Sequence, residues 1–511
     1  MAADYEWNHT GTGLWTDTSS WSPTAPTGGP GVGDSATINQ GTVEINAIPV
    51  TVDALSVGDV GILNLSNAAV STGAYGIGGI ANHSGGSFET TSMQLSADNA
   101  TAILHLFDET SLWVKGHASI GYGGGAAKSA VINQTSGVFK VGDVDSAASL
   151  TLAGHGYGAE NAFQAIYNMQ GGTFECYGLV QMTGSEFSDS GLAQWNIHEG
   201  SVVNIQPASN SPDYYIGVCI GGMSLSDFMG GRAELNIYGG EINVQGNIIG
   251  GSHNSHLNIY GSKADIHVEN MFNSMGYEQG SLDVNFMLDS HGTTTINASG
   301  DIDLTYSLSP DVEVNIPAFF SLKTATTDLV SVAGTITNFT VKDNTPFHFI
   351  ETRPTVGDDT VVRLTMSGDH DSWNLVGTYE VFDAMNPDGK ESGALKVTGS
   401  ESVPLHAVFT GLDGLADVLV EYLNSAVVET GMSFSKIDET TLLLDGDYLG
   451  DGYAWFGWDL SGFNSGGYDV KLYQFNTLLE PFDTDVPEPS TWAMLLLGGA
   501  AMVGMRIRRR K

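Results

Sequence analysis

The sequence predicts an all-β protein, in which a right-handed parallel β-helix (a β-solenoid) is followed by a β-sandwich-like domain and a short C-terminal membrane helix. Small polar residues alternate with Val, Ile and Leu through most of the 511 residues, and glycine occurs 66 times. This composition suits many short strands joined by glycine turns. One unit recurs between residues 80 and 270, and an apolar run closes the chain. We therefore divide the chain into residues 1–50, 51–317, 318–485 and 486–511.

The recurring unit has the form apolar–Asn–apolar, a glycine turn, an alternating strand and a second glycine turn. It is clearest in segments 132–141, 167–176 and 235–244, and looser copies begin at Trp195 and Leu257. Six asparagines occupy the same place in it: Asn82, Asn133, Asn168, Asn196, Asn236 and Asn258. Six apolar residues fall at another common place, on one strand face: Phe88, Phe139, Phe174, Val202, Ile242 and Ala264.

Three short strands per unit, with glycine corners, describe one coil of a parallel β-helix. A single coil cannot bury its own apolar face, so coils must stack. We expect the six asparagines to face inward at a corner and to form a ladder that satisfies buried corner N–H and C=O groups. A Greek-key sandwich also gives short alternating strands, but it does not predict an asparagine at a fixed offset from a glycine pair. The longer units require loops at 143–164, 184–193 and 206–214.

The first 50 residues form a distinct start, assigned here to an N-terminal cap and the first strands. Its signature residues are Trp7, Gly11, Gly13, Trp15, Asp17, Trp21, Pro23 and Pro26, and the segment GDSATI follows at 33–38. This start resembles the N-terminal cap of bacterial surface β-helix proteins with autotransporter-like strand repeats. Because a solenoid must cover the open edge of its first coil, we expect the three tryptophans to plug that end. Stacking on carbohydrate is the alternative.

The unit fades from about residue 318, where longer and more aromatic strand segments begin, such as 379–382 and 453–458. We expect a separate β-rich domain over 318–485. One helix is predicted near 412–426, because Leu415, Val418, Leu419 and Tyr422 fall at helical spacing.

The formal net charge of -40 excludes nucleic acid as a partner, because phosphate binding needs a basic patch. Such a surface suits salty surroundings or attracts divalent cations, Ca²⁺ above all. The two cysteines, Cys176 and Cys219, rule out a disulfide framework. They either pair with each other or remain buried thiols.

No catalytic residues are assigned. Parallel β-helices include polysaccharide lyases and hydrolases, whose sites need carboxylates clustered on one face. The candidates are Asp143 with Asp145, Asp301 with Asp303, and the segment Asp369-His370-Asp371. We interpret each as ordinary surface charge, because no Arg or Lys recurs near them and fold alone does not grant activity.

The segment around Asp445, Asp447 and Asp451 is the best metal candidate. Its spacing partly matches a Ca²⁺ loop, but Leu449 stands where an oxygen ligand is needed and the later Glu is missing. A Gly-Asp hairpin turn and a structural Ca²⁺ site both remain open. No other cofactor is expected.

The last 25 residues contain three parts in order. A Pro-Glu-Pro turn at Pro487, Glu488 and Pro489 cannot be helical. The apolar run after it includes Trp492, Leu495, Leu496, Leu497 and Val503, and it is short for a membrane span, which needs about 20 residues. The basic cluster closes the chain and is expected on the cytoplasmic side: Arg506, Arg508, Arg509, Arg510 and Lys511.

This tail resembles the PEP-CTERM sorting signal of Gram-negative bacteria. The resemblance implies export, recognition by an exosortase-type membrane transpeptidase, and cleavage near residues 487–489. It also implies an inner-membrane anchor before processing and the cell surface or matrix afterwards. The start at Ala2-Ala3-Asp4 is typical of residues just after a small-residue cleavage site, so we expect an export signal that this sequence does not include.

We therefore expect a secreted surface or extracellular-matrix protein with a structural or adhesive role. A secreted polysaccharide lyase or hydrolase on the same scaffold is the first alternative. A carbohydrate-binding module is the second, with an extracellular polysaccharide as partner.

Overall fold

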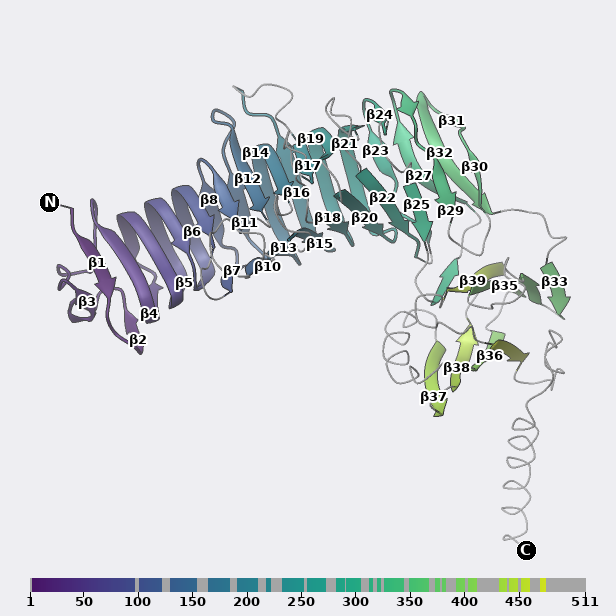
Figure 1. Cartoon of the computed structure of the whole chain (residues 1–511), viewed down its shortest axis with the longest axis horizontal. Coiled ribbons are helices and arrows are strands. Elements are labelled where there is room, and N and C mark those ends of the chain that lie inside the picture. Colours follow the sequence, from purple (N-terminus) through teal and green to yellow (C-terminus); the bar gives the residue numbers. More distant parts are fainter. Residues whose placement is uncertain are drawn as a thin grey trace, which may run out of the picture.

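A computed structural model of the chain is shown in Figure 1. It describes residues 2–96, 101–121, 129–153, 164–183, 191–209, 217–221, 232–251, 255–272, 282–289, 291–304, 312–315, 319–322, 326–343 and 349–366, and the backbone of later strands between residues 373 and 474. The described chain is all-β: apart from one 3-10 turn at Thr18–Ser20, its regular elements are strands.

The N-terminal strands surround three buried tryptophans. Strand β1 (Asp4–Trp7) pairs antiparallel with β3 (Trp21–Ser22) and parallel with β4 (Ser35–Asn46), and β2 (Thr12–Leu14) pairs parallel with the second half of β4. Trp7, Trp15 and Trp21 are at most 2% exposed and pack edge to face. Their burial suits a plug for the first coil and leaves no ring face for stacking on sugar.

The central body consists of coils that stack in parallel. Strands β5 (Pro49–Ile77) and β6 (Ile80–Leu95) each run through a whole coil and pair in register. In the next coil the chain divides into β7 (Ala102–Phe107), β8 (Ser111–Val114) and β9 (Ala118–Ile120). These pair parallel with β10 (Ser129–Gln134), β11 (Val138–Val141) and β12 (Ala148–Ala153), respectively. Three ladders of strands result, which we number first, second and third (Figure 1).

The ladders continue coil by coil along the body. The first ladder adds β13 (Gln164–Met169), β15 (Leu192–Ile197), β18 (Arg232–Ile237), β20 (Ser255–Tyr260), β22 (Leu282–Met287), β25 (Val312–Asn315) and β29 (Val341–Asp343). The second and third ladders share β14 (Gly172–Thr183), β19 (Gly240–Gly250) and β21 (Ala264–Phe272). The second adds β16 (Ser201–Gln206), β23 (Ile296–Ala298) and β27 (Thr326–Val332), and the third adds β17 (Gly217–Ile220), β24 (Ile302–Asp303) and β28 (Ile336–Thr337).

Two boundaries inferred from the sequence need correction. Parallel pairing passes residue 317 and reaches β28 and β29, because alternating strands persist after the Asn-Gly motif ends. The second ladder then ends against β32 (Asp359–Met366), which runs antiparallel to β27 and also pairs with β30 (Phe349–Thr352) and β31 (Thr355–Val356). The expected loop at 143–164 is interrupted by strand β12.

A continuous row of apolar side chains fills the second ladder's inner face. Its buried members are Val70, Phe88, Leu112, Phe139, Phe174, Val203, Ile242, Ile266, Ile296, Val330 and Val362. The row contains Val203 and Ile266 at the two positions where the repeat predicted Val202 and Ala264. The reason is turn length: the turn before Val203 is one residue longer, and that before Ile266 two residues longer, than the turn before Ile242.

The second glycine of the repeated turn is required by backbone geometry. Gly137, Gly172 and Gly240 have φ angles of 74°, 83° and 94°, which favour glycine. A Cβ at Gly240 would lie 2.6 Å from the carbonyl oxygen of Ser201 on the coil below. The glycine pair of the motif therefore marks the corner between the first and second ladders.

The later strands form two antiparallel sheets. One contains β26 (Phe319–Leu322), β39 (Gly452–Asp459), β35 (Ser392–Gly399), β34 (Tyr379–Phe382) and β33 (Trp373–Val376). The other contains β37 (Met432–Asp438), β38 (Thr441–Tyr448), β36 (Val403–Thr410) and β40 (Asp469–Gln474). The helix expected at 412–426 and the tail from 486 lie outside the described residues. Among the residues that the structure describes, no helix has the length and apolar character of a membrane span.

A histidine, His83, lies fully inside the apolar core. His83 on β6 stacks on Tyr75 and Phe88, and its Nε2 lies 2.9 Å from the Tyr75 hydroxyl oxygen. Burial lowers the pKa of His83 from 6.5 to about 3. Between these two pH values the imidazole therefore stays neutral in the folded protein, whereas the unfolded chain takes up a proton there.

Replacing His83 with Gln should reduce the sensitivity of the fold to acid. The stability that depends on neutral His83 is fully present above pH 6.5 and is lost as the pH falls towards 3, by about 1.4 kcal/mol per pH unit. Gln does not titrate and still offers a partner to the Tyr75 hydroxyl. In urea unfolding at pH 7, 5 and 4, the native protein should lose stability more steeply than His83→Gln. Parallel pH slopes would contradict the assignment.

Candidate functional site on the outer face of the first ladder

The outer face of the first ladder carries ordered rows of side chains. Along these strands every second residue is buried, and the residues between them point away from the core. Because coils pair in register, each outward position repeats from coil to coil. One such row, which we name the asparagine row, consists of Asn64, Asn82, His105, Asn133, Asn168, Asn196, Asn236, Asn258, Asn285, Glu313 and Lys342.

The orientation expected for the asparagines is wrong. They lie within the strands, close to the strand ends, and on the outer face, not inward at a corner. Tyr167 and Met169, which flank Asn168, are both 0% exposed and fill the core. In an apolar–Asn–apolar triplet, strand alternation sends the two apolar side chains inward and the amide outward. Asn236 is nevertheless only 2% exposed, since neighbouring amides and a carboxylate cover it.

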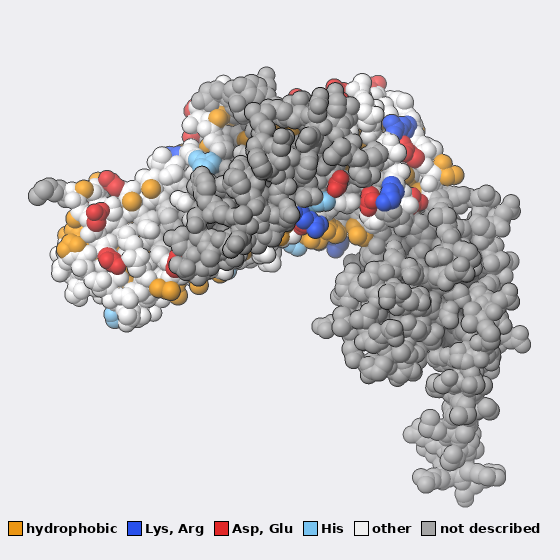
Figure 2. Space-filling view, in the orientation of Figure 1, with side chains coloured by type: hydrophobic (Ala, Val, Ile, Leu, Met, Phe, Trp, Pro, Cys, Tyr) orange, Lys and Arg blue, Asp and Glu red, His pale blue; other side chains and the backbone are white. Residues whose placement is uncertain are grey.

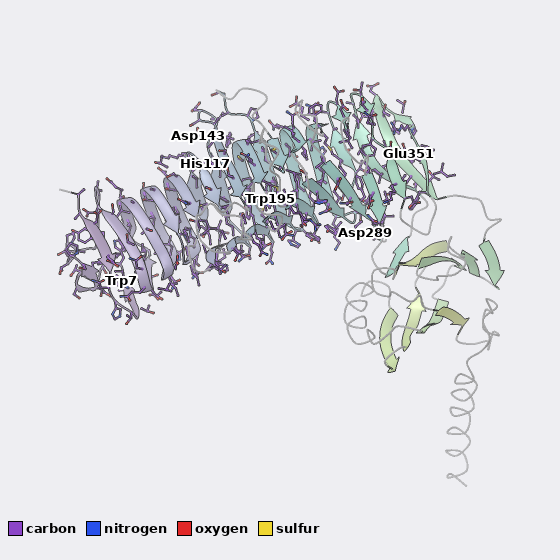
Figure 3. The ribbon with its side chains drawn as sticks, viewed as in Figure 1. Trp7, His117, Asp143, Trp195, Asp289 and Glu351 are labelled. Carbon is purple, nitrogen blue, oxygen red and sulfur yellow. The ribbon has the colours of Figure 1, made fainter. Side chains whose placement is uncertain are left out.

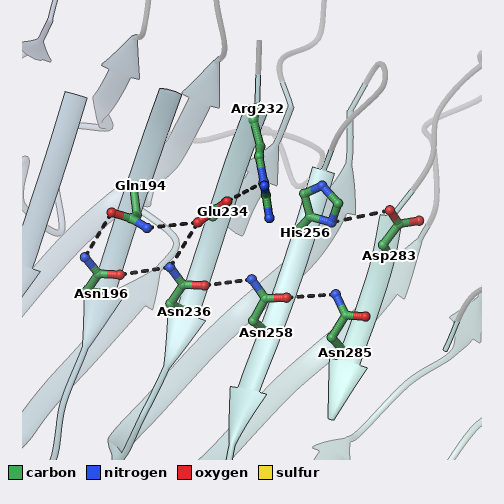
Figure 4. Close-up of polar contacts among 9 residues, drawn as sticks. All are labelled: Gln194, Asn196, Arg232, Glu234, Asn236, His256, Asn258, Asp283 and Asn285. Atoms are coloured by element: carbon green, nitrogen blue, oxygen red, sulfur yellow. Dashed lines mark hydrogen bonds and ion pairs between the residues drawn. The ribbon is translucent and has the colours of Figure 1, made fainter. Parts of the chain in front are cut away.

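The amides bond to one another in a single direction. From Asn168 onward each asparagine Nδ2–H donates to the Oδ1 of the asparagine on the preceding coil, at 2.9 Å for Asn168 to Asn133 and 2.7 Å for Asn196 to Asn168. Asn236, Asn258 and Asn285 continue the chain at 2.9, 2.7 and 2.8 Å (Figure 4). Aligned hydrogen bonds of this kind polarise one another. The row is thus a polarised chain of amides along the body.

A charged cluster lies beside the asparagine row on the strands β15 to β22 (Figure 4). We define it as Gln194, Glu234, His256 and Asp283, each two residues before an asparagine of the row, together with Arg232. Glu234 accepts hydrogen bonds from Gln194 at 2.9 Å and from Asn236 at 3.4 Å, and it forms an ion pair with Arg232. Nδ1 of His256 lies 3.3 Å from a carboxylate oxygen of Asp283. The Glu234 side chain is only 12% exposed, so its carboxylate is held in one position.

The cluster brings together the groups that acid–base chemistry on a glycan would need. Burial lowers the pKa of His256, and the charge of Arg232 acts in the same direction, while Asp283 and Glu234 oppose it. The imidazole is therefore neutral at pH 7 and can accept a proton. Glu234 and Asp283 stand on β18 and β22, two coils apart, so about 10 Å separates their backbones. His256 on β20 stands in register between the two carboxylates.

Sequence reasoning missed this cluster, although a signal was present. The position two residues before the asparagine is aliphatic in the early coils, at Ile80, Ile103 and Ile166. It becomes polar only in the later coils, from Gln194 to Asp283. Aligning the copies on their asparagine would have exposed that change.

An aromatic stack flanks the other side of the row. His198, Tyr238 and Tyr260 occupy successive coils, with ring centroids 4.7 and 4.4 Å apart and nearly parallel planes. Burial raises the pKa of Tyr260 to about 12, and Tyr238 and Glu234 contribute in the same direction. The stacked rings cover part of one another's faces.

The carboxylates expected from the sequence have local structural contacts. Asp143 accepts a hydrogen bond from the backbone N–H of Asp145 in a turn, and Figure 3 places it at the same edge as His117. Asp301 accepts bonds from the backbone and hydroxyl of Thr335 on the next coil, and these lower its pKa. Asp303 lies in strand β24. Residues 369–371 lie outside the described residues.

Two of the three aspartates of the predicted metal site lie in a strand and not in a loop. Asp445 and Asp447 lie within strand β38, paired with β36, and Asp451 lies outside the described residues. Among the described side chains, no three of the His, Cys, Asp and Glu type gather as a metal would require. Cys176 and Cys219 are buried and form no disulfide, and burial raises the pKa of Cys176 to about 12.

Comparison with known proteins identifies one segment. Residues 485–511 match the model of the PEP-CTERM protein-sorting motif, which includes Pro487, Glu488 and Pro489, the apolar run and the basic cluster. The match covers the tail and not the coil body. No curated protein and no solved structure is significantly similar to the chain.

The asparagine row yields a test of its energetic role. Asn236→Ala should lower the free energy of unfolding by about 1–3 kcal/mol, because Asn196 and Asn258 both lose a partner at a covered position. Asn285→Ala removes the bond to Asn258 at the end of the chain of amides and should cost less. Urea unfolding of both variants measures the difference. Equal losses would show that the row does not act as a connected chain.

Proposed function

We propose that this chain is an exported, non-catalytic protein of the cell surface or extracellular matrix, with an adhesive or coat-forming role. The observation that carries the proposal is the PEP-CTERM motif at residues 485–511. That motif indicates a protein that is exported and sorted by an exosortase. In this proposal the enzyme cleaves near Pro487, Glu488 and Pro489. Residues 492–505 hold the precursor in the inner membrane until then, with the basic end in the cytoplasm.

The coil body supports a structural role through its regularity. We propose that it is the right-handed β-solenoid expected from the sequence, in which each coil contacts mainly its neighbours. Such a body is stiff and long, because ladder hydrogen bonds run along its axis. On the face shown in Figure 2, the acidic side chains of the described residues are scattered over the surface. The net charge of -40 keeps copies soluble during export.

Replacing Pro487 and Pro489 with Ala should block sorting. The double variant removes the residues that prevent helix at the motif, so the transpeptidase loses its recognition turn. We expect full-length precursor to accumulate in the membrane fraction and the processed body to disappear from the surface, as followed by immunoblotting of cell fractions. Pro481→Ala, just upstream of the motif, is the control and should be processed normally. Unchanged processing of the double variant would refute the sorting role.

A second candidate function, a polysaccharide lyase or hydrolase, is favoured by the charged cluster. Glu234 and Asp283 are held near a neutral His256 and an arginine, as acid–base cleavage of an acidic glycan requires.

If this candidate is correct, Glu234→Gln and Asp283→Asn should each reduce glycan cleavage at least 100-fold, measured as new reducing ends with and without Ca²⁺. Glu313→Gln, on the same face, is the control and should retain activity. Absence of cleavage by the native chain, or equal cleavage by all three variants, would leave the non-catalytic role.

A further inference from the structure

Two lysine ammonium groups converge on one tryptophan on the outer face of the second ladder. Trp113 on β8 lies in register between Glu89 on β6 and Lys140 on β11. The Nζ atoms of Lys115 and Lys140 lie 4.8 and 5.2 Å from the Trp113 ring centroid. Lys140 Nζ also lies 5.0 Å from the ring of Tyr177 on β14. We name Trp113, Lys115, Lys140 and Tyr177 the aromatic–lysine cluster.

Lys140 differs from the other described cations in lacking a carboxylate partner. The remaining six each form an ion pair: Lys115, Arg232, Lys263, Lys342, Arg353 and Arg363. Lys140 has Glu175 as its neighbour in register, yet among the described side chains none forms an ion pair with it. In a chain with 58 acidic and 18 basic residues, an unpaired ammonium beside a second ammonium is a local site for an external anion.

The cluster is built on rigid parts of the ladder. The Trp113 indole N–H donates to the carbonyl oxygen of Gly142 at 2.9 Å, which fixes the ring while leaving it half-exposed. Lys140 and Tyr177 project from adjacent coils that pair in register. Burial raises the pKa of Tyr177, and the charges of Glu175 and Asp143 add to that rise. The phenol therefore keeps its proton and remains a hydrogen-bond donor.

We propose that the aromatic–lysine cluster binds a carboxylate-bearing sugar unit of an acidic polysaccharide. The sugar carboxylate supplies the partner that Lys140 lacks and draws the Lys140 ammonium away from the rings. The apolar C–H face of the sugar then packs against Trp113 and Tyr177. Sugar hydroxyls donate to the carboxylates of Glu89 and Glu175, which border the cluster.

The overall negative charge of the chain does not prevent this binding at physiological salt. The Debye length is then about 8 Å, so carboxylates farther than that from the cluster are largely screened. The nearby Glu89 already pairs with Lys115, which reduces its repulsion. The proposal concerns a ligand of the body and is independent of how the tail is sorted.

Binding of defined oligosaccharides to the full-length chain tests the proposal. The probes are hexamers of galacturonic acid and of mannuronic acid, and the fully methyl-esterified galacturonic hexamer as a neutral match. We expect isothermal titration at 0.15 M salt to show that at least one acidic hexamer binds at least 10-fold more tightly than the ester. Lys140→Gln and Trp113→Ala should each weaken that binding at least 10-fold. Lys342→Gln, on the first ladder, should change it less than twofold.

Several results would overturn the proposal: no binding of either acidic hexamer, equal binding of the ester, or equal binding by Lys140→Gln. Trp113→Phe, which keeps a ring, should retain part of the affinity and shows whether loss in Trp113→Ala reflects misfolding. None of these results alters the processing assay on Pro487 and Pro489, so failure of this site and failure of the sorting role are distinguishable.

Discussion

Parallel pairing in register between successive coils is the constraint on which the rest of the structure depends. Asn133 lies beside Asn168, and Phe139 lies beside Phe174. Whatever one coil places at a position therefore becomes part of a row. The apolar core row, the asparagine row, the charged cluster and the aromatic–lysine cluster all follow from this one rule. A residue in this fold is best understood with its neighbours one coil before and after.

The same rule limits which side chains a row can contain. Like charges directly opposite each other in adjacent strands repel, so a row of identical residues must be apolar or self-complementary. Asparagine meets that need because each amide both donates and accepts. Where charges do enter a row they alternate with other types, as in Glu313 followed by Lys342. This requirement accounts for the low charged fraction, 15%, of a chain whose net charge is nonetheless large.

The sequence was sufficient to predict an all-β chain, a stack of repeated units and the sorting motif, because each rests on a strong local pattern. The outward face of the asparagines also follows from the sequence pattern, because alternation in an apolar–Asn–apolar triplet turns the amide away from the two buried side chains, and the inward corner expected for them conflicts with that rule. The core row contains Val203 and not the expected Val202, because one extra turn residue moves every following side chain to the opposite face. The contact between His256 and Asp283 joins two neighbouring coils, and its residues are far apart in the sequence.

The direction of the amide chain has a consequence for how the body grows. Every asparagine from Asn168 to Asn285 donates backwards, towards the N-terminal tryptophans. The C-terminal end of a partly assembled stack therefore exposes an amide oxygen that can accept a hydrogen bond from the N–H of the next coil. The two ends of such a stack therefore offer different groups to a further coil, an amide acceptor at the C-terminal end and an amide donor at the N-terminal end. The body thus carries a built-in sense of direction, which an otherwise uniform ladder would not have.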